Sequence, residues 1–195
     1  MYAIYSTEGI VLGGTDSGPT SRYLYIFTEK FGLIYARAQG IRALKSKLRY
    51  NLQVLSYAEI ELVRGNYGWR VINVRSICNH GVFSSENTPA KIQMLCRITA
   101  LLRRLLRGEE ENKKLFEEVR EGFKYSRRLS DSLIHSLEIV LVMRVLYMLG
   151  YWGETETFRM LLERDLEEQG LLEEVVKIKS PLIREINKSL HATQL

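Results

Sequence analysis

The sequence predicts an α+β protein in which a small barrel of five strands is followed by an all-helical region. As far as residue 78, short runs of alternating apolar and polar residues are separated by glycine-containing turns, a pattern typical of strands. From Thr88 onward, apolar residues recur every three or four positions, as in helices that bury one face. The period changes within 79–86, so we expect two domains, residues 1–80 and 81–195.

Each expected strand follows from one short segment. The segments are residues 8–12, 23–28, 33–39, 57–64 and 69–77. The glycine- and proline-containing segment 13–19 is expected to end the first strand as a turn. In the second segment Tyr23 and Tyr25 share one face and Leu24 and Ile26 the other, so the tyrosines fit either a core or a surface position. Five such short strands favour a closed barrel over a sandwich, because closure leaves no strand edge exposed.

Five helices are expected after the strands, each with its own boundary signals. They begin at Thr88–Pro89, near Leu115, at Ser130 or Asp131, at Thr155 and at Ser180–Pro181, and the first, third and fourth end at Gly108, Gly150 and Gly170. The third is apolar on most sides, which indicates a central position in a helical bundle.

The net positive charge comes entirely from the strand region. Up to Val82 there are ten Lys and Arg residues against five Asp and Glu, whereas the rest of the chain carries 18 of each. Eight of the eleven tyrosines also fall in this first part. This asymmetry favours a nucleic-acid or anionic surface on the barrel, with a scaffold or protein-contact role for the helices.

The strongest local signal runs from the third expected strand into the loop that follows it. No acidic residue lies between Glu29 and Glu59, yet six cations fall there. Such a field attracts polyanions, and an aromatic ring beside an arginine suits stacked bases. The alternative interpretation of the same cluster is a solvated loop that only adds solubility.

Several other classes of function are disfavoured by the sequence. Segment 13–20 comes close to a phosphate-binding loop, but Pro19 stands where the phosphate-pairing lysine should be, so ATP binding is not expected. Cys78 and His80 have no second ligand pair nearby, and no nucleophile and base stand at usable spacing. We therefore expect no cofactor, no metal and no catalysis. Reduced thiols and the absence of a signal or membrane segment indicate a cytoplasmic protein.

The order of motifs resembles a known family. Ile10–Leu12, a glycine turn, Arg22, Phe27–Gly32, Ala38–Arg42, Lys45–Ser46, Leu52–Gln53 and the Glu59/Glu61 strand are similar to the amino-terminal part of bacterial RecO, the DNA repair and recombination mediator family. The segment from Leu137 to Tyr151 resembles the helical domain of the same family. The resemblance is dense only in residues 8–62.

The resemblance implies an oligonucleotide-binding (OB) barrel followed by a helical domain. It implies binding of single- and double-stranded DNA and annealing of complementary strands without nucleotide hydrolysis. The implied partners are RecR and the acidic tail of the single-stranded DNA-binding protein, with loading of RecA as the outcome. Many members carry a zinc-binding cysteine cluster after the segment that ends in Tyr151. Residues 152–195 contain no cysteine, so no such zinc site is expected here.

Nine residues are the candidates for DNA binding. They are Arg22, Tyr35, Arg37, Arg42, Lys45, Lys47, Arg49, Trp69 and Arg70. Trp69 is expected to be exposed, because it follows a hairpin loop and precedes Arg70. Cationic helix flanks such as Arg103 and Arg104 fit either a groove for an acidic peptide or an ordinary solvated face. A protein-interaction or RNA-binding adaptor with an OB barrel is the alternative function, and an enzyme such as a nuclease comes third.

Overall fold

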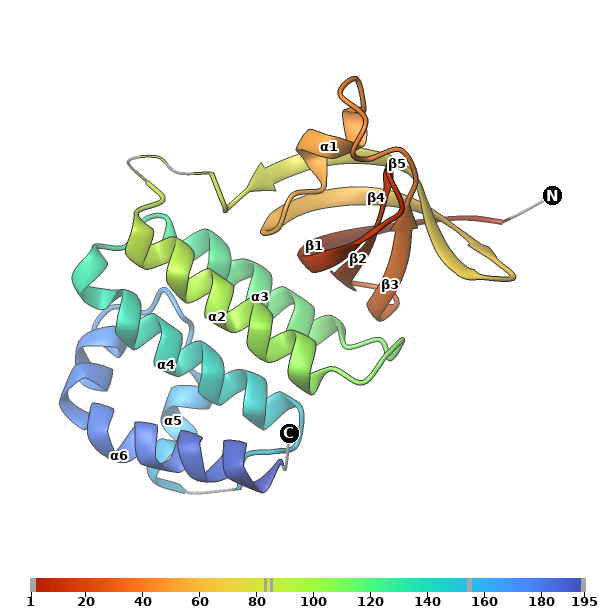
Figure 1. Cartoon of the computed structure of the whole chain (residues 1–195). Helices are drawn as coiled ribbons and strands as arrows, with labels where there is room; N and C mark the ends of the chain where they lie inside the picture. The colour runs from red at the N-terminus through yellow and green to blue at the C-terminus, as the bar shows by residue number, and fades with distance from the viewer. Residues whose placement is uncertain (1–2, 83, 85, 154–155, 194–195) are drawn as a thin grey trace. The chain divides into compact units, whose positions relative to one another are not determined.

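The computed structural model describes residues 3–82, 84, 86–153 and 156–193. It confirms the predicted fold class, an α+β chain with a five-stranded barrel followed by helices (Figure 1). The strands and the short helix among them are β1 (Ile4–Ser17), β2 (Ser21–Thr28), β3 (Gly32–Ala38), α1 (Lys47–Asn51), β4 (Ser56–Gly65) and β5 (Gly68–Asn79). The later helices are α2 (Pro89–Leu105), α3 (Lys113–Ser126), α4 (Asp131–Met148), α5 (Glu156–Glu163) and α6 (Leu171–Ala192).

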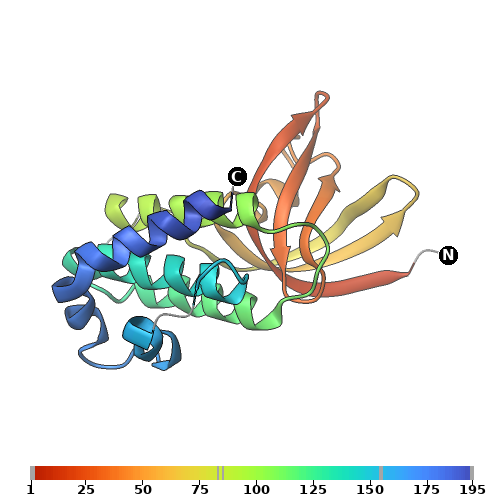
Figure 2. The same ribbon diagram turned by 90° about the horizontal axis from the view of Figure 1, so that it is seen from below.

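The strands close into a barrel of the OB type. Their order around the barrel is β1-β2-β3-β5-β4, and β4 returns to β1. All neighbouring strands are antiparallel except β3 and β5, which pair in parallel with Ala36 opposite Trp69 and Arg37 opposite Arg70. The β1–β2 and β4–β5 hairpins both extend away from the body of the barrel (Figure 2). The parallel pair places residues of β3 beside the start of β5, and this juxtaposition builds the site described below.

Strand alternation decides which residues fill the barrel. Leu24, Ile26, Ile34, Ala36 and Ala38 are buried inside it, in one cluster with residues of the other strands. Because successive side chains of a strand point to opposite faces, the residues between them on β2 and β3 point outward. The tyrosines of these strands therefore lie on the outer wall, which answers the question that the sequence left open.

The first strand is longer than predicted. Segment 13–19 does not end it, because β1 continues to Ser17 and pairs with β2 to the hairpin. Gly14 lies in this extension, where an added Cβ would stand 2.5 Å from the Tyr23 carbonyl oxygen. The glycine at this position therefore permits the close approach of two strands. In the sequence alone, a glycine of this kind looks the same as one that forms a turn.

The basic loop also contains structure that was not predicted. Residues 47–51 form the short helix α1 within the segment that was expected to be an open loop. Leu52 is buried in the barrel cluster and Leu48 packs against it. These two residues stand four apart, which is the spacing that places side chains on one face of a helix.

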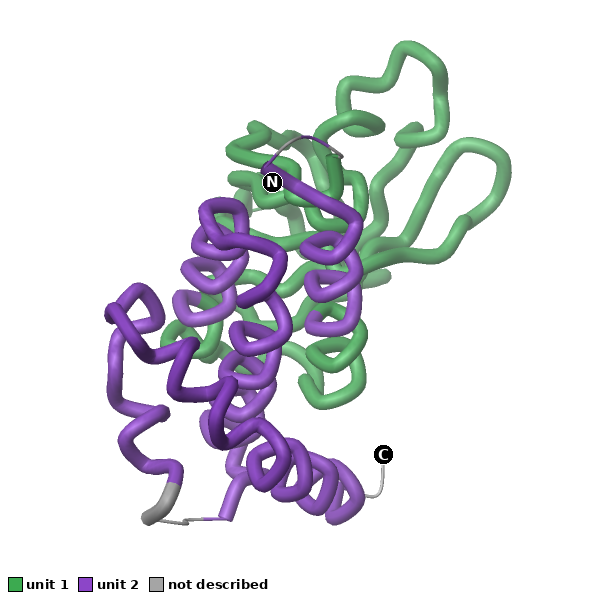
Figure 3. The backbone as a smooth tube through the Cα atoms, turned by 90° about the vertical axis from the view of Figure 1, so that its left-hand side faces the viewer, with its two compact units in different colours: residues 1–82, 99–116 green, residues 83–98, 117–195 purple. Residues whose placement is uncertain are grey.

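By compactness the chain forms two units (Figure 3). Residues 1–82 and 99–116 form the first, and residues 83–98 and 117–195 form the second. Segment 99–116 joins the strands through specific contacts: Phe116 packs edge-to-face on Phe27 at 5.4 Å, and the Leu33 N–H donates to the Gly108 carbonyl at 3.1 Å. The first unit also contains the end of α2 and the start of α3, so its bounds differ from those of the expected domain 1–80. The domain boundary near residue 80 stays a prediction.

The second unit is organised around α4. Of its residues, Ile134, Leu137, Val140, Leu141 and Leu146 are among those that are buried. The start of α4 at Asp131 agrees with the predicted start of the third helix. The predicted cap at Thr155 lies outside the described residues, and α5 is shorter than expected, ending at Glu163. No helix in the described part of the chain is long and apolar enough to span a bilayer.

The predicted helix start at Ser180–Pro181 corresponds to a break inside a longer helical element. Helix α6 begins at Leu171 and contains Pro181 in its interior. Leu171 and Val175 are buried, so packing holds the preceding turns in helical form despite the proline. The backbone departs from helical geometry at Ile178 (φ −110°, ψ 17°), three residues before Pro181. The proline ring and its missing N–H account for the kink there, so α6 consists of two helical segments, and the second begins close to the predicted Ser180–Pro181.

Candidate nucleic-acid interface

Three tyrosines stand in a row on the outer wall of the barrel, and we call them the tyrosine stack. The rings of Tyr23 and Tyr35 are 4.8 Å apart and nearly parallel, with 14° between their planes. Tyr25 lies 4.8 Å from the central ring of the row, Tyr35, at 38°. The Tyr35 hydroxyl is 2.9 Å from Thr15 Oγ1, and 44% of Tyr35 is exposed. Aromatic pairs of this kind hold one another in place, so the row presents a preformed aromatic surface.

An arginine from α2 covers the Tyr25 end of the tyrosine stack. Arg103 Cζ lies 4.4 Å from the centre of the Tyr25 ring, a cation–π arrangement. On β1, a Cβ added to Gly13 would stand 2.8 Å from Arg103 Nη1, so the guanidinium fills the space of a missing side chain. Tyr25, Ala100, Arg103 and Arg104 line a pocket of about 350 Å³ at this end.

Two further arginines lie at the Tyr23 end. Arg37 is opposite Tyr23 in the β2–β3 register and opposite Arg70 in the β3–β5 register. Both arginines are exposed, and among the described residues neither has a carboxylate within ion-pair distance. With Tyr23 and the β4–β5 hairpin they line a pocket of about 450 Å³. We call Tyr23, Tyr25, Tyr35, Arg37 and Arg70 the wall cluster.

The prediction that Trp69 is exposed is wrong. Only 4% of its surface is accessible, and it belongs to the barrel core. Its ring packs against Tyr5 at 5.3 Å and Phe31 at 5.1 Å, and the Arg64 guanidinium lies 5.2 Å from its centre. The physical reason is strand parity: Arg70 points outward, so Trp69 beside it on β5 points inward. The indole still lines part of the 450 Å³ pocket from below the surface.

The remaining candidates form a second group around the basic loop, which we call the loop cluster. Its members are Arg22, Arg42, Lys45, Lys47 and Arg49. Asp16 pairs with two of them, with its Oδ1 3.2 Å from Arg22 Nε and its Oδ2 3.4 Å from Arg42 Nη1. One carboxylate therefore offsets part of the charge of two arginines. These pairs are solvent-exposed, so they stabilise little and leave the arginines open to exchange for phosphate.

The other three cations of the loop cluster are exposed. Lys45 precedes α1, and Lys47 and Arg49 belong to it. In the part of the chain that the structure describes, no ion pair to a carboxylate involves any of the three. Arg49 joins Asp16, Arg22 and Arg42 around a pocket of about 450 Å³.

The nine predicted residues thus divide between two surfaces and the core. Tyr35, Arg37 and Arg70 lie on the barrel wall, the loop cluster lies at the basic loop, and Trp69 is internal. Sequence reasoning left Tyr23 and Tyr25 undecided and did not connect Arg103 with the barrel. The signal that could have found the two tyrosines is the alternation of β2, which places them on the same face of the sheet as Tyr35. The contact of Arg103 with Tyr25 has no such signal, because it depends on the fold.

The two clusters together have the chemistry of a polyanion surface. Long cations without compensating carboxylates can neutralise phosphates, and flat rings beside them can receive unpaired bases. None of the described residues forms a group of three or more His, Cys, Asp or Glu able to hold a metal ion. No residue pattern here distinguishes one base from another, so the surface favours binding that tolerates any sequence.

The amino-terminal part matches a known protein family. Residues 1–79 match the family described as "Recombination protein O N terminal". A DNA repair protein RecO from Alkaliphilus metalliredigens is 42% identical over 62 residues, 32% of this chain and 25% of the relative. One from Dehalococcoides mccartyi is 38% identical over 61 residues, 31% of this chain and 24% of the relative.

A longer but more distant match extends into the helices. The DNA repair protein RecO of Clostridium novyi is 23% identical over 155 residues, which cover 79% of this chain and 59% of the relative. The chain thus spans about a quarter of the first two relatives and less than two thirds of the third.

Proposed function

We propose that the chain acts as a member of the RecO family of DNA repair proteins, whose amino-terminal domain its residues 1–79 match, and that it binds single-stranded DNA and anneals complementary strands in recombinational repair. The wall cluster and the loop cluster are the DNA-binding surfaces in this proposal. The observation that carries it is the row of three tyrosines in ring contact, with Arg37 and Arg70 beside them lacking a carboxylate partner among the described residues, on an OB-type barrel.

The wall cluster has the arrangement that OB barrels use for single strands. Strands 2 and 3 and the adjoining hairpin loops form the usual oligonucleotide surface of this fold. Here β2 and β3 carry the tyrosine stack, and the β4–β5 hairpin borders the pocket that contains Arg37 and Arg70. Stacked bases account for affinity without base-specific readout, which a repair protein acting at any sequence requires.

Annealing follows from charge neutralisation and needs no nucleotide hydrolysis. Two complementary strands repel each other through their phosphates, so a surface that neutralises one backbone lowers the barrier to their approach. The loop cluster supplies five cations within 28 residues of sequence, with Asp16 as the acidic group beside two of them. In this scheme the wall cluster holds one strand while the loop cluster neutralises phosphates.

Partner contacts belong, in this proposal, to the helical region. From residue 83 onward positive and negative residues are equal in number, so this region offers no general attraction for DNA. We assign to it the docking of RecR and of the acidic tail of the single-stranded DNA-binding protein, leading to loading of RecA. The protein acts here as a mediator without catalysis of its own.

A strand-annealing assay tests the core of the proposal. Two complementary labelled strands are mixed with magnesium and without ATP, with and without the protein. Faster pairing than the uncatalysed rate is expected, with both strands intact. No binding to DNA at low salt, or cleavage of the strands, overturns the proposal. Binding to RNA or a peptide alone supports the adaptor in its place.

Neutralising cations of the loop cluster tests whether these residues contribute to DNA binding. Arg42→Gln, Lys45→Gln and Lys47→Gln together are expected to weaken single-strand binding about tenfold or more. The slope of log affinity against log salt should fall by roughly 0.7 for each phosphate that is no longer neutralised. Fluorescence anisotropy across a salt series measures both quantities. Arg75→Gln is the control, because Arg75 is exposed on the same barrel but belongs to neither cluster and lines neither of their pockets. An unchanged affinity in the triple variant contradicts the assignment of this loop.

A further inference from the structure

We propose that single-stranded nucleic acid, in preference to duplex, lies along the tyrosine stack, and that Arg103 and Arg104 of α2 hold its backbone at the Tyr25 end. The inference rests on the nucleic-acid binding proposed above and extends it to a helical segment outside the barrel strands. It adds two DNA-binding residues that neither the sequence pattern nor the family match identifies as such.

The tyrosine stack has a cationic group at each end. At one end Arg103 lies over Tyr25 at 4.4 Å, and Arg104 lines the pocket beside it. At the other end Tyr23 borders the pocket that contains Arg37 and Arg70. The three rings stand between these ends, so the row matches the chemistry of a single strand, with phosphate sites outside and base sites within.

Arg103 is held where it can serve a ligand as well as the fold. Its guanidinium is placed by the Tyr25 ring on one side and by the empty position at Gly13 on the other. Within the described residues no carboxylate forms an ion pair with Arg103 or Arg104, and both side chains are exposed. An arginine stacked on a ring keeps the N–H groups at its edge available for a phosphate.

The aromatic row also explains the preference for single strands. Tyrosine rings gain from bases only where a base face is unstacked and accessible. In a duplex the bases are paired and stacked within the helix, so the rings can contact little more than its backbone. The loop cluster has no such limitation, because lysines and arginines neutralise the phosphates of either form.

Paired probes test the inference by anisotropy. One is a labelled single strand of about 16 nucleotides, the upper length that one OB barrel covers. The other is a closed hairpin duplex. Arg103→Gln with Arg104→Gln is expected to weaken single-strand binding by about tenfold, the effect of removing one stacking or phosphate interaction, and to change hairpin binding by less than about twofold. Arg75→Gln again serves as the control, with wild-type affinity for both probes.

Two further variants separate a binding role from a structural one. Tyr25→Leu removes the ring and is expected to lower single-strand affinity with the hairpin unaffected. Arg104→Gln alone is expected to lower it about threefold without a change in the urea midpoint, because Arg104 is exposed at the pocket and its substitution leaves Arg103 in place over Tyr25. This variant keeps the inference testable if loss of Arg103 destabilises the protein.

The outcomes distinguish this inference from the function on which it rests. One outcome is that the double variant binds the single strand as wild type does while the loop-cluster variant loses affinity. In that case the assignment of Arg103 and Arg104 to DNA binding is overturned and the proposed function stands. Equal losses for single strand and hairpin overturn the strand preference. If the wild-type protein binds neither probe at low salt, both proposals fail together.

Discussion

Arg37 and Arg70 on the barrel and Arg144 in the second compact unit have opposite surroundings. On the barrel wall Arg37 and Arg70 are exposed neighbours without a carboxylate partner among the described residues. In the second unit Arg144 is 4% exposed and bonds at every side of its guanidinium: to Glu118 Oε1 at 2.7 Å, to the Leu161 carbonyl at 2.8 and 3.1 Å, and to the Arg164 carbonyl. The guanidinium of Arg144 is therefore fully engaged by the fold, whereas those of Arg37 and Arg70 are available to a ligand.

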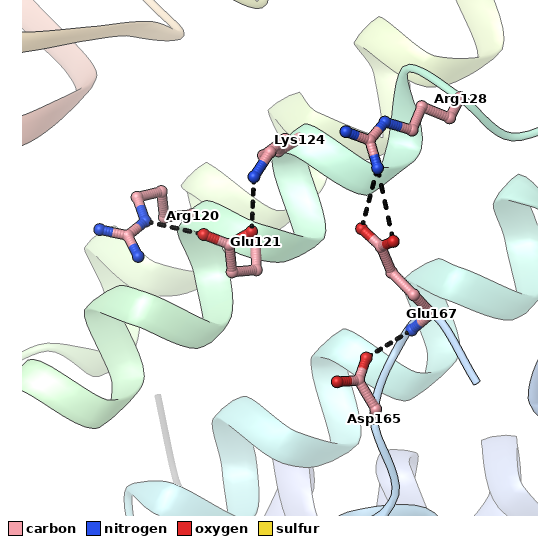
Figure 4. A network of polar contacts seen from close by, with 6 residues as sticks. All are labelled: Arg120, Glu121, Lys124, Arg128, Asp165 and Glu167. Atoms are coloured by element: carbon pink, nitrogen blue, oxygen red, sulfur yellow. Dashed lines mark hydrogen bonds and ion pairs between the residues drawn. The ribbon is translucent and has the colours of Figure 1, made fainter.

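Surface charges of the second unit are paired in a similar way. Figure 4 shows Glu121 between Arg120 and Lys124, with oxygen–nitrogen distances of 3.1 and 3.3 Å. Nearby, Arg128 reaches both carboxylate oxygens of Glu167. At Arg97 the hydrogen bond to Glu138 raises the pKa of the guanidinium above its ordinary value. Balanced composition in the helices thus goes with local pairing, whereas the barrel pairs some of its arginines, such as Arg75 with Glu59, and leaves Arg37 and Arg70 without a carboxylate partner among the described residues.

The largest expected effect is the loss of Arg144. Arg144→Met leaves the Glu118 carboxylate and the backbone carbonyls of Leu161 and Arg164 without their donor, and removing one member of a buried pair costs about 3–5 kcal/mol. Urea unfolding followed by circular dichroism measures the free energy of unfolding. Arg159→Gln, at an exposed pair with Glu163, is the control and is expected to stay within about 0.5 kcal/mol of wild type. A loss below about 1 kcal/mol for Arg144→Met contradicts the structural role of this arginine.

Aromatic residues allow the same comparison inside the barrel unit. Trp69→Ala empties a packed position between Tyr5 and Phe31 and is expected to lower the free energy of unfolding by about 3–5 kcal/mol. Tyr35→Ala removes an outward ring and is expected to cost about 1 kcal/mol, through its two cross-strand partners. Tyr35→Ala is also expected to lower the affinity for single-stranded DNA while the protein stays folded, as fluorescence anisotropy can measure. Equal stability losses for the two variants contradict the assignment of core and wall.

The smallest expected effect has the opposite sign. Arg37 and Arg70 are register partners with like charge, and like charges opposite each other on a sheet repel. Arg70→Gln is therefore expected to raise the free energy of unfolding by about 0.2–0.5 kcal/mol at low salt and to lower DNA affinity. The gain should disappear at high salt, where the repulsion is screened. A stability loss in place of this gain indicates that Arg70 has a structural partner.

Sequence periodicity is enough for the fold class because it reports burial directly. Alternation in 33–39 and 57–64 corresponds to β3 and β4, and Thr88–Pro89 marks the start of α2 as predicted. Boundaries are less certain where one residue type serves two purposes. Gly14 permits strand contact although its sequence context indicates a turn, and Pro181 kinks a helix that packing continues. In both cases tertiary contacts decide between the two meanings.

The candidate site divides in the same way. Charge asymmetry indicates the barrel as the region that carries a surface for anionic ligands. The cations of the basic loop are exposed as expected, and their binding role stays a prediction. The neighbours of Trp69 in sequence favour a surface position, whereas parity on β5 sends its ring inward. Arg103 stacks on a residue 78 positions earlier in the chain. Contacts at such a separation leave no local pattern, so only the fold brings them together.

The sharing of α2 and α3 between units has a consequence for how this barrel can be moved between proteins. Phe27 is fully buried, and its ring partner Phe116 comes from well beyond the last strand. A fragment that stops after β5 would leave that ring without its cover, as well as Tyr25 without Arg103. Recombination of this module during evolution, or its transplantation by an engineer, therefore has to carry the stretch as far as Phe116, because the strands alone are an incomplete unit of inheritance.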